Sequence, residues 1–75
     1  MKYIYTLSID GMRCGMCESH INDQIRKNFD AVKVKSNRHK KQTIIVSSKE
    51  LDVDKIERVI KDTGYYYNGL RVDTK

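Results

Sequence analysis

The chain has 75 residues, of which 39% are hydrophobic and 33% are charged, and its net charge is +5. This length supports one small domain with a modest core and leaves little room for a deep substrate pocket. No apolar run approaches the roughly 18 residues of a membrane span, and the first residues lack the apolar stretch of a signal peptide. We therefore expect a single domain over residues 1–75, located in the reducing cytoplasm.

The first predicted element is a strand over residues 2–9. Apolar side chains occupy every second position, as on one face of a pleated strand: Tyr3, Tyr5, Leu7 and Ile9. Asp10 and Gly11 suit the turn that ends it. From about residue 15 to residue 28 the apolar spacing changes to four, which predicts a helix. The inner face of this helix would carry Cys17, Ile21, Ile25 and Phe29.

Two strands and a second helix are predicted next. Residues 31–35 indicate a strand, residues 36–42 a polar, basic hairpin turn, and residues 43–47 a third strand. The continuous apolar character of the third strand favours a central, well-covered position. Asp52 is expected to cap a helix that runs to about residue 62, and Gly64 fits the position just after its end. The apolar stripe of this helix would be Val53, Ile56, Val59 and Ile60.

A last strand is expected around residues 69–72. The predicted order is therefore strand, helix, strand, strand, helix, strand. Such an order builds an α+β, ferredoxin-like βαββαβ sandwich, in which a four-stranded antiparallel sheet carries both helices on one face. The loop after the first strand would lie at one edge of this sandwich, beside the turn that contains Gly64 and Tyr65.

The loop after the first strand contains the only two cysteines, Cys14 and Cys17. The positive end of the following helix would stabilise their thiolates. Two close thiolates are a soft ligand pair that favours Cu(I) or Zn(II) over Mg(II) or Ca(II). In a cytoplasmic chain such a pair indicates a metal site or a redox site. A thiol-disulfide redox protein remains the alternative, although the chain lacks the Trp and Pro of a thioredoxin-like motif.

The run Gly-Met-Arg-Cys-Gly-Met-Cys at residues 11–17 resembles the Gly-Met-x-Cys-x-x-Cys motif of heavy-metal-associated (HMA) domains. This family includes small copper chaperones and the amino-terminal domains of copper-exporting ATPases. The resemblance implies that Cys14 and Cys17 are the metal ligands. It further implies that Met12 anchors the loop in the core and that Tyr65 packs near the metal and shields it. His20 stands where the family usually has a small residue.

The choice of metal follows from the number of ligands. Zinc prefers about four ligands, whereas two thiolates satisfy Cu(I). Zinc and cadmium members of the family often carry a carboxylate at the position of Arg13, whose positive charge here favours a bis-thiolate Cu(I) centre. We expect a Cu(I)-binding metallochaperone or metal-sequestering protein that passes its ion on by ligand exchange and is not an enzyme. A Zn(II), Cd(II) or Hg(II) module of the same fold is the alternative.

His20 lies three residues after Cys17, so on a helix it could face the same ion as an auxiliary ligand. The competing interpretation is a boundary histidine that contacts water. Met16, between the cysteines, is expected to be exposed and available for partner contact.

The resemblance implies a metal-transporting P-type ATPase, or another acidic metal acceptor, as partner. The basic hairpin around Arg38 would steer such a partner. Two copies could also share a metal ion through four cysteines, as a metal-bridged homodimer. Nucleic acid is not expected as a partner, because no RNA-binding signature accompanies the strand tyrosines.

Overall fold

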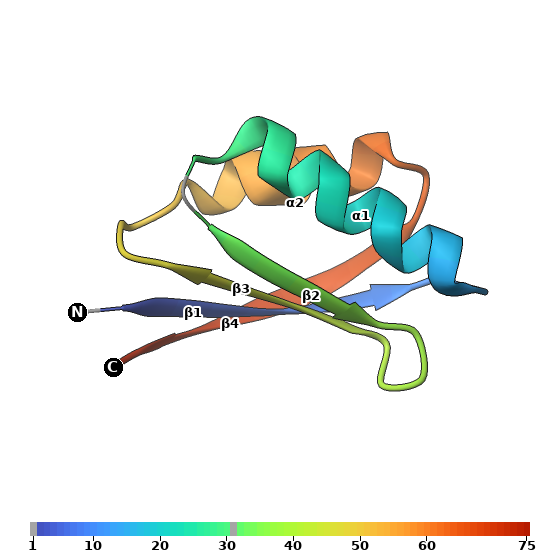
Figure 1. Ribbon diagram of the computed structural model, residues 1–75, viewed down its shortest axis with the longest axis horizontal. Helices are drawn as coiled ribbons and strands as arrows, with labels where there is room; N and C mark the ends of the chain where they lie inside the picture. Colours follow the sequence, from blue (N-terminus) through green and yellow to red (C-terminus); the bar gives the residue numbers. More distant parts are fainter. Residues whose placement is uncertain (1, 31) are drawn as a thin grey trace.

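The computed structural model describes residues 2–30 and 32–75. Its elements are β1 (Tyr3–Asp10), α1 (Gly15–Asn28), β2 (Lys33–Asn37), β3 (Gln42–Ser47), α2 (Val53–Asp62) and β4 (Tyr66–Thr74). The strands form one antiparallel sheet in the order β2-β3-β1-β4, and both helices lie on one face of it (Figure 1). This arrangement confirms the predicted ferredoxin-like fold. No helix in the described ranges is long and apolar enough to cross a bilayer.

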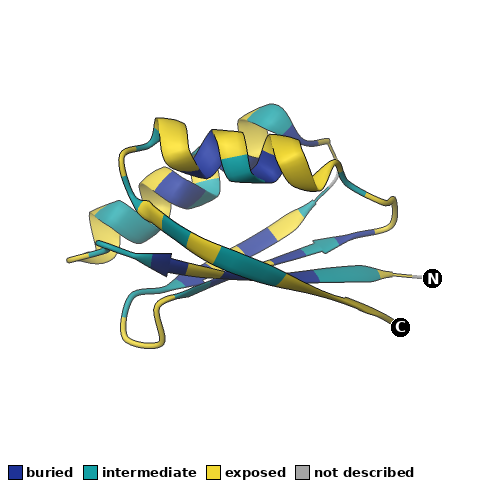
Figure 2. Cartoon of the chain, turned by 180° about the vertical axis from the view of Figure 1, so that it is seen from behind, coloured by how far each residue is buried: buried dark blue, intermediate teal, exposed yellow. Residues whose placement is uncertain are grey.

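The core lies between the helices and the sheet, and buried positions alternate with more exposed ones along β1, β2 and β3 (Figure 2). Its buried members are Tyr5, Leu7, Ile9, Ile21, Ile25, Phe29, Val34, Ile45, Ile56, Val59 and Ile60. Asp52 caps α2 as predicted, because its side chain accepts hydrogen bonds from the backbone N–H groups of Asp54 and Lys55 at 3.0 and 3.3 Å. Sequence periodicity therefore identified most of the surfaces that pack together.

The hairpin between β2 and β3 differs from the prediction. β2 begins at Lys33 rather than residue 31, which lies outside the described residues, and it extends to Asn37. The hairpin turn is therefore residues 38–41 rather than 36–42. The reason is that Ser36, a polar residue, is buried and bonded. Its hydroxyl contacts Asn22 Oδ1 at 2.7 Å and Thr43 Oγ1 at 2.9 Å, so the strand continues through it.

Two expectations about burial were wrong. β3 is central, but it is covered on one face only, and Ile44 on its other face is 37% exposed. The cause is that both helices pack on the same side of the sheet. Val53 is 40% exposed because it is the first residue of α2 and lies beyond the buried part of its stripe.

β4 is longer than the predicted strand, since it starts at Tyr66 and ends at Thr74. Its pairing with β1 is interrupted by a bulge: Leu7 pairs with Leu70 and Ile9 with Tyr67, which leaves Asn68 and Gly69 opposite Ser8. Gly69 has a φ of 116°, a conformation that side chains disfavour. The bulge places Tyr67 and Leu70 on the same face although they are three residues apart. Because the bulge interrupts the alternation of side chains, the sequence pattern did not predict the residues of β4 that precede Gly69.

Candidate metal centre

The loop of residues 11–14 connects β1 to α1 and lies beside the first residues of β4. Gly11 has a φ of 97°, and its N–H donates to Asp10 Oδ1 at 2.9 Å. A Cβ atom built on Gly11 would lie 3.5 Å from Tyr65 Cδ1 and 3.5 Å from Tyr66 Cδ2. Glycine therefore permits the turn, and a methyl group at this position would make ordinary van der Waals contacts with the two tyrosines.

Cys14 and Cys17 are brought together by the start of α1. Cys14 is the N-cap residue and is exposed, whereas Cys17 lies in the first turn and is partly buried. The N–H of Cys17 donates to the carbonyl of Cys14 at 3.0 Å, and the two Sγ atoms are 3.9 Å apart. Both cysteines are free. Sulfurs at this separation can both lie at ~2.3 Å from one thiophilic metal ion.

The surroundings of Cys17 favour its thiolate. A hydrogen bond from the backbone of Arg13, followed by hydrogen bonds from the Tyr65 hydroxyl and the backbone of Cys14, lowers the pKa of the Cys17 thiol to about 7. The same contact with Cys17, together with burial, raises the pKa of Tyr65 to about 12. At neutral pH the Tyr65 hydroxyl is therefore protonated and can donate a hydrogen bond. A large fraction of Cys17 is then the thiolate, which accepts this bond.

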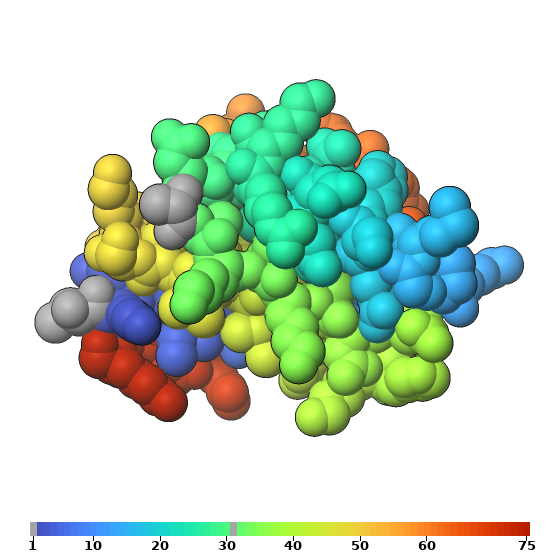
Figure 3. Space-filling view, viewed as in Figure 1, coloured from blue at the N-terminus to red at the C-terminus, as the bar shows by residue number. Residues whose placement is uncertain are grey.

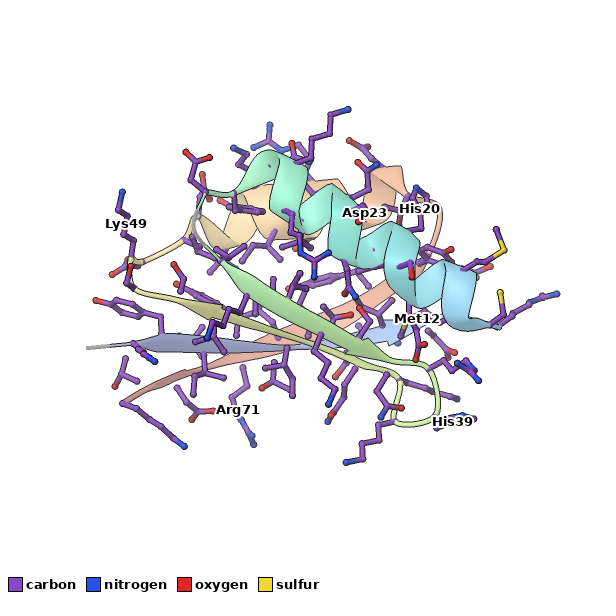
Figure 4. All side chains as sticks on the ribbon, in the orientation of Figure 1. Met12, His20, Asp23, His39, Lys49 and Arg71 are labelled. Atoms are coloured by element: carbon purple, nitrogen blue, oxygen red, sulfur yellow. The ribbon has the colours of Figure 1, made fainter. Side chains whose placement is uncertain are left out.

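The other residues that the sequence suggested for this site differ in their burial and in their contacts. Met12 is partly buried and packs against the core, and Figure 4 shows it below α1, toward the sheet. His20 is exposed and lies above α1 in the same view, with its ring edge-on to Tyr65 at a centroid distance of 6.1 Å. Met16 is 82% exposed. Tyr65 thus contacts both Cys17 and His20.

The candidate site consists of two free thiols. Within residues 2–30 and 32–75, no group of three or more His, Cys, Asp or Glu side chains is close enough to hold one metal ion. His20 is therefore not placed with Cys14 and Cys17 as a three-ligand set in this structure. One exposed and one partly buried thiol form an open arrangement that offers few ligands.

The sequence reasoning missed an ion pair that fixes this end of α1. Glu18 accepts from the backbone N–H of Arg38 at 2.7 Å and from its Nη1 at 3.1 Å. The contact holds the hairpin turn against the first turn of α1, and the two segments touch in the space-filling view (Figure 3). The partners are 20 positions apart, so no local pattern could reveal them.

Comparison with known families supports the geometry. A family model described as the heavy-metal-associated domain matches residues 6–66. The chain belongs to this family. The matched range contains the loop, both cysteines, His20 and Tyr65, so all the site residues of this heavy-metal-associated domain lie within it.

Solved structures similar to this heavy-metal-associated domain include the yeast copper transporter domain Ccc2A, determined in apo and Cu(I)-loaded states. That domain is 27% identical, with a TM-score of 0.78 over 93% of this chain and 97% of Ccc2A. The CsoZ metallochaperone has the same fold, with 23% identity and a TM-score of 0.76 over 92% of this chain and 100% of its own. No curated protein sequence matches the chain.

Proposed function

We propose that the chain is a Cu(I) carrier that holds one ion between the thiolates of Cys14 and Cys17. The observation that carries this proposal is the pair of free, accessible sulfurs 3.9 Å apart. Two thiolates can satisfy Cu(I), whereas they leave Zn(II) short of its usual four ligands. The similarity to Ccc2A, a domain that was determined with Cu(I), supports the choice of copper.

Transfer would occur by ligand exchange. A cysteine thiolate of the acceptor bonds to the ion and forms a three-coordinate species, after which one bond from Cys14 or Cys17 to the ion breaks. The ion remains Cu(I), so no electron donor or acceptor is needed, and the released thiolate can take up a proton from water. The lowered pKa of Cys17 makes this thiolate a stable leaving group at neutral pH.

The proposal includes a cellular setting. A non-enzymatic carrier with two free thiols requires a reducing compartment, and we place it in the cytoplasm. Its acceptor would be a metal-transporting P-type ATPase or another acidic metal acceptor with its own cysteine pair. Without an acceptor, two copies could share copper through four cysteines as a metal-bridged homodimer.

An anaerobic competition titration of the reduced protein tests the metal and the site. Cu(I) is presented against a coloured chelator, with Zn(II) in a parallel titration. We expect tight one-to-one Cu(I) binding, weak Zn(II) binding, and loss of the Cu(I) site in the Cys14→Ser, Cys17→Ser double variant.

Stronger Zn(II) than Cu(I) binding would contradict the choice of metal. Unchanged Cu(I) stoichiometry in the double variant would contradict the site. Failure to bind either ion, combined with a readily reversible Cys14–Cys17 disulfide, would favour the thiol-disulfide redox alternative.

A further inference from the structure

The face of the sheet opposite the helices, here called the open sheet face, has a distinctive composition. Side chains alternate across a strand, so the neighbours of buried Tyr5, Val34 and Ile45 point to this face. The strand registers place them in two rows across β2, β3, β1 and β4. One row is Lys33, Val46, Ile4 and Asp73, and the other is Lys35, Ile44, Thr6 and Arg71.

The apolar residues of these rows are flanked by lysines on the β2 side. Ile4, Ile44 and Val46 occupy the two central strands, with Lys33 and Lys35 on one side and the ion-paired Arg71 and Asp73 on the other. Four shallow hollows on this face have cavity volumes of about 360, 220, 130 and 110 Å³. Their charged lining residues are all basic: Lys2, Lys33, Lys35, Lys40 and Arg71.

Acidic residues are concentrated elsewhere. Asp73 is paired with Arg71 at 3.3 Å, and Asp10, at the end of β1, is 3.8 Å from Lys41. The other acids lie on the helices or the segments that flank them: Glu18, Asp23, Asp30, Glu50, Asp52, Asp54, Glu57 and Asp62. Lys33 and Lys35 form no ion pair with any residue in the described ranges. The positive net charge of the chain is therefore concentrated on the sheet and its hairpin.

We propose that the open sheet face is a docking surface for an acidic polypeptide segment with aliphatic side chains at its centre. The carboxylates would pair with Lys33 and Lys35, and the aliphatic side chains would cover Ile44 and its apolar neighbours. Such a surface combines electrostatic steering at the rim with apolar burial at the centre. A second copy of the chain does not fit, because two basic faces repel each other.

Nucleic acid fits this face less well than an acidic polypeptide. Single-stranded nucleic acid binds through rings on which its bases stack. Three of the strand tyrosines turn away from the open sheet face: Tyr5 is 1% exposed, and Tyr3 and Tyr67 pack against the core. The exposed Tyr66 is the first residue of β4, opposite Asp10, and lies outside the two rows. The centre of the face is aliphatic instead, which suits aliphatic side chains.

Docking at this surface is independent of the metal site. Cys14 and Cys17 lie in the loop at the end of β1, whereas Ile44 and Lys35 lie within β3 and β2. A partner on the open sheet face would leave both thiols accessible. The Cys14→Ser, Cys17→Ser double variant should therefore bind the partner normally, so failure of this proposal is distinguishable from failure of the copper proposal.

Amide chemical-shift mapping by NMR tests the surface on the reduced, metal-free protein. The probe is a synthetic peptide in which glutamates flank two central leucines. We expect the shifts to concentrate on Lys33, Lys35, Ile44 and Val46, with little change at Cys14. Peptides in which lysine replaces glutamate, or serine replaces leucine, should bind at least about tenfold more weakly.

Matched variants separate this surface from general charge and hydrophobicity. Lys33→Glu with Lys35→Glu should weaken peptide binding about tenfold or more, since two attractions become repulsions. Lys27→Glu with Arg58→Glu changes the net charge equally on the helices and should weaken it less than about threefold. Ile44→Ser should weaken binding, whereas Val53→Ser, at a similar exposure, should not.

Three outcomes would overturn the proposal. The first is the absence of peptide binding to a folded protein. The second is equal weakening by the helix pair and the β2 pair, which would indicate charge attraction alone. The third is a preference of this face for a single-stranded RNA oligonucleotide over the acidic peptide.

Discussion

Glu18 binds Arg38 through two hydrogen bonds, one from the backbone N–H and one from the guanidinium group. Glu18 directly follows Cys17, so the contact ties the hairpin turn to the turn of α1 that carries this thiol. It acts together with Asn22, one helical turn later, which contacts Ser36. The position of Cys17 is thus set by β2 and the hairpin as well as by its own helix.

This contact predicts unequal effects of removing its two partners. Arg38→Met removes the guanidinium bond and keeps the backbone bond, whereas Glu18→Ala removes both. Because the pair is only partly exposed, we expect Glu18→Ala to reduce the free energy of unfolding by ~1–2 kcal/mol and Arg38→Met by about half as much. Urea denaturation measures both. Asp23→Ala, which breaks the exposed pair with Arg26, is the control and should change stability little; equal costs for the three variants would contradict the prediction.

Gly11 and Gly64 provide a matched test of the loop. Both have positive φ, 97° and 91°, so alanine at either should cost ~1–2 kcal/mol of backbone strain. Only Gly11 lies in the loop that leads to Cys14, whereas Gly64 follows the end of α2. We therefore expect the backbone strain of Gly11→Ala to shift this loop and weaken Cu(I) binding, and Gly64→Ala to leave it unchanged. Similar copper affinities in the two variants would show that the conformation of Gly11 does not position the thiols.

The hydrogen bond from Tyr65 predicts a pH effect on copper binding. With the pKa of Cys17 at about 7, protons compete for this thiolate mainly below that pH, and the apparent Cu(I) affinity falls as the pH falls further. Tyr65→Phe removes one of the bonds that lower this pKa, so competition should begin at higher pH. The ultraviolet absorbance of the thiolate, followed against pH, measures the shift. Tyr66→Phe, at an exposed tyrosine, should leave the titration unchanged, and an unshifted Tyr65→Phe curve would exclude the proposed role.

The exposed histidines predict little contribution to copper binding. His20 contacts Tyr65 and is not grouped with the two thiols, so His20→Ala should change Cu(I) affinity less than about threefold. His39→Ala, at an exposed position of the hairpin turn, serves as the matched control. A loss of tenfold or more that is specific to His20→Ala, measured by chelator competition, would instead make His20 an auxiliary ligand.

The sequence predicted the fold well because its determinants are local. Alternation in β1, four-residue spacing in α1 and the cap at Asp52 each specify an element without reference to the rest of the chain. The thiol pair was equally visible, because Cys14 and Cys17 are neighbours on one helical turn. Whether those cysteines bind copper stays a prediction.

The features that escaped prediction depend on distant partners. From the sequence, Ser36 is typical of a turn. Its hydrogen bonds to Asn22 and Thr43 explain why it is instead a buried residue of β2. The contact between Glu18 and Arg38 joins helix α1 to a hairpin turn that lies 20 positions away in the sequence. The start of β4 was hidden because the bulge reverses its alternation, although the Asn68-Gly69 pair is a recognisable signal for such an irregularity.

The bulge in β4 also limits where this chain can tolerate a change of length. Deletion of Asn68 or Gly69 would leave one residue opposite Ser8, and Tyr67 would still face the helices with Leu70. Insertion of a residue between Tyr67 and the bulge would instead turn the tyrosine run by half a pleat. Tyr66 would then point toward the thiols in place of Tyr65, and it would present the same phenol there. Three consecutive tyrosines therefore preserve a hydroxyl donor beside Cys17 even when the strand slips by one residue.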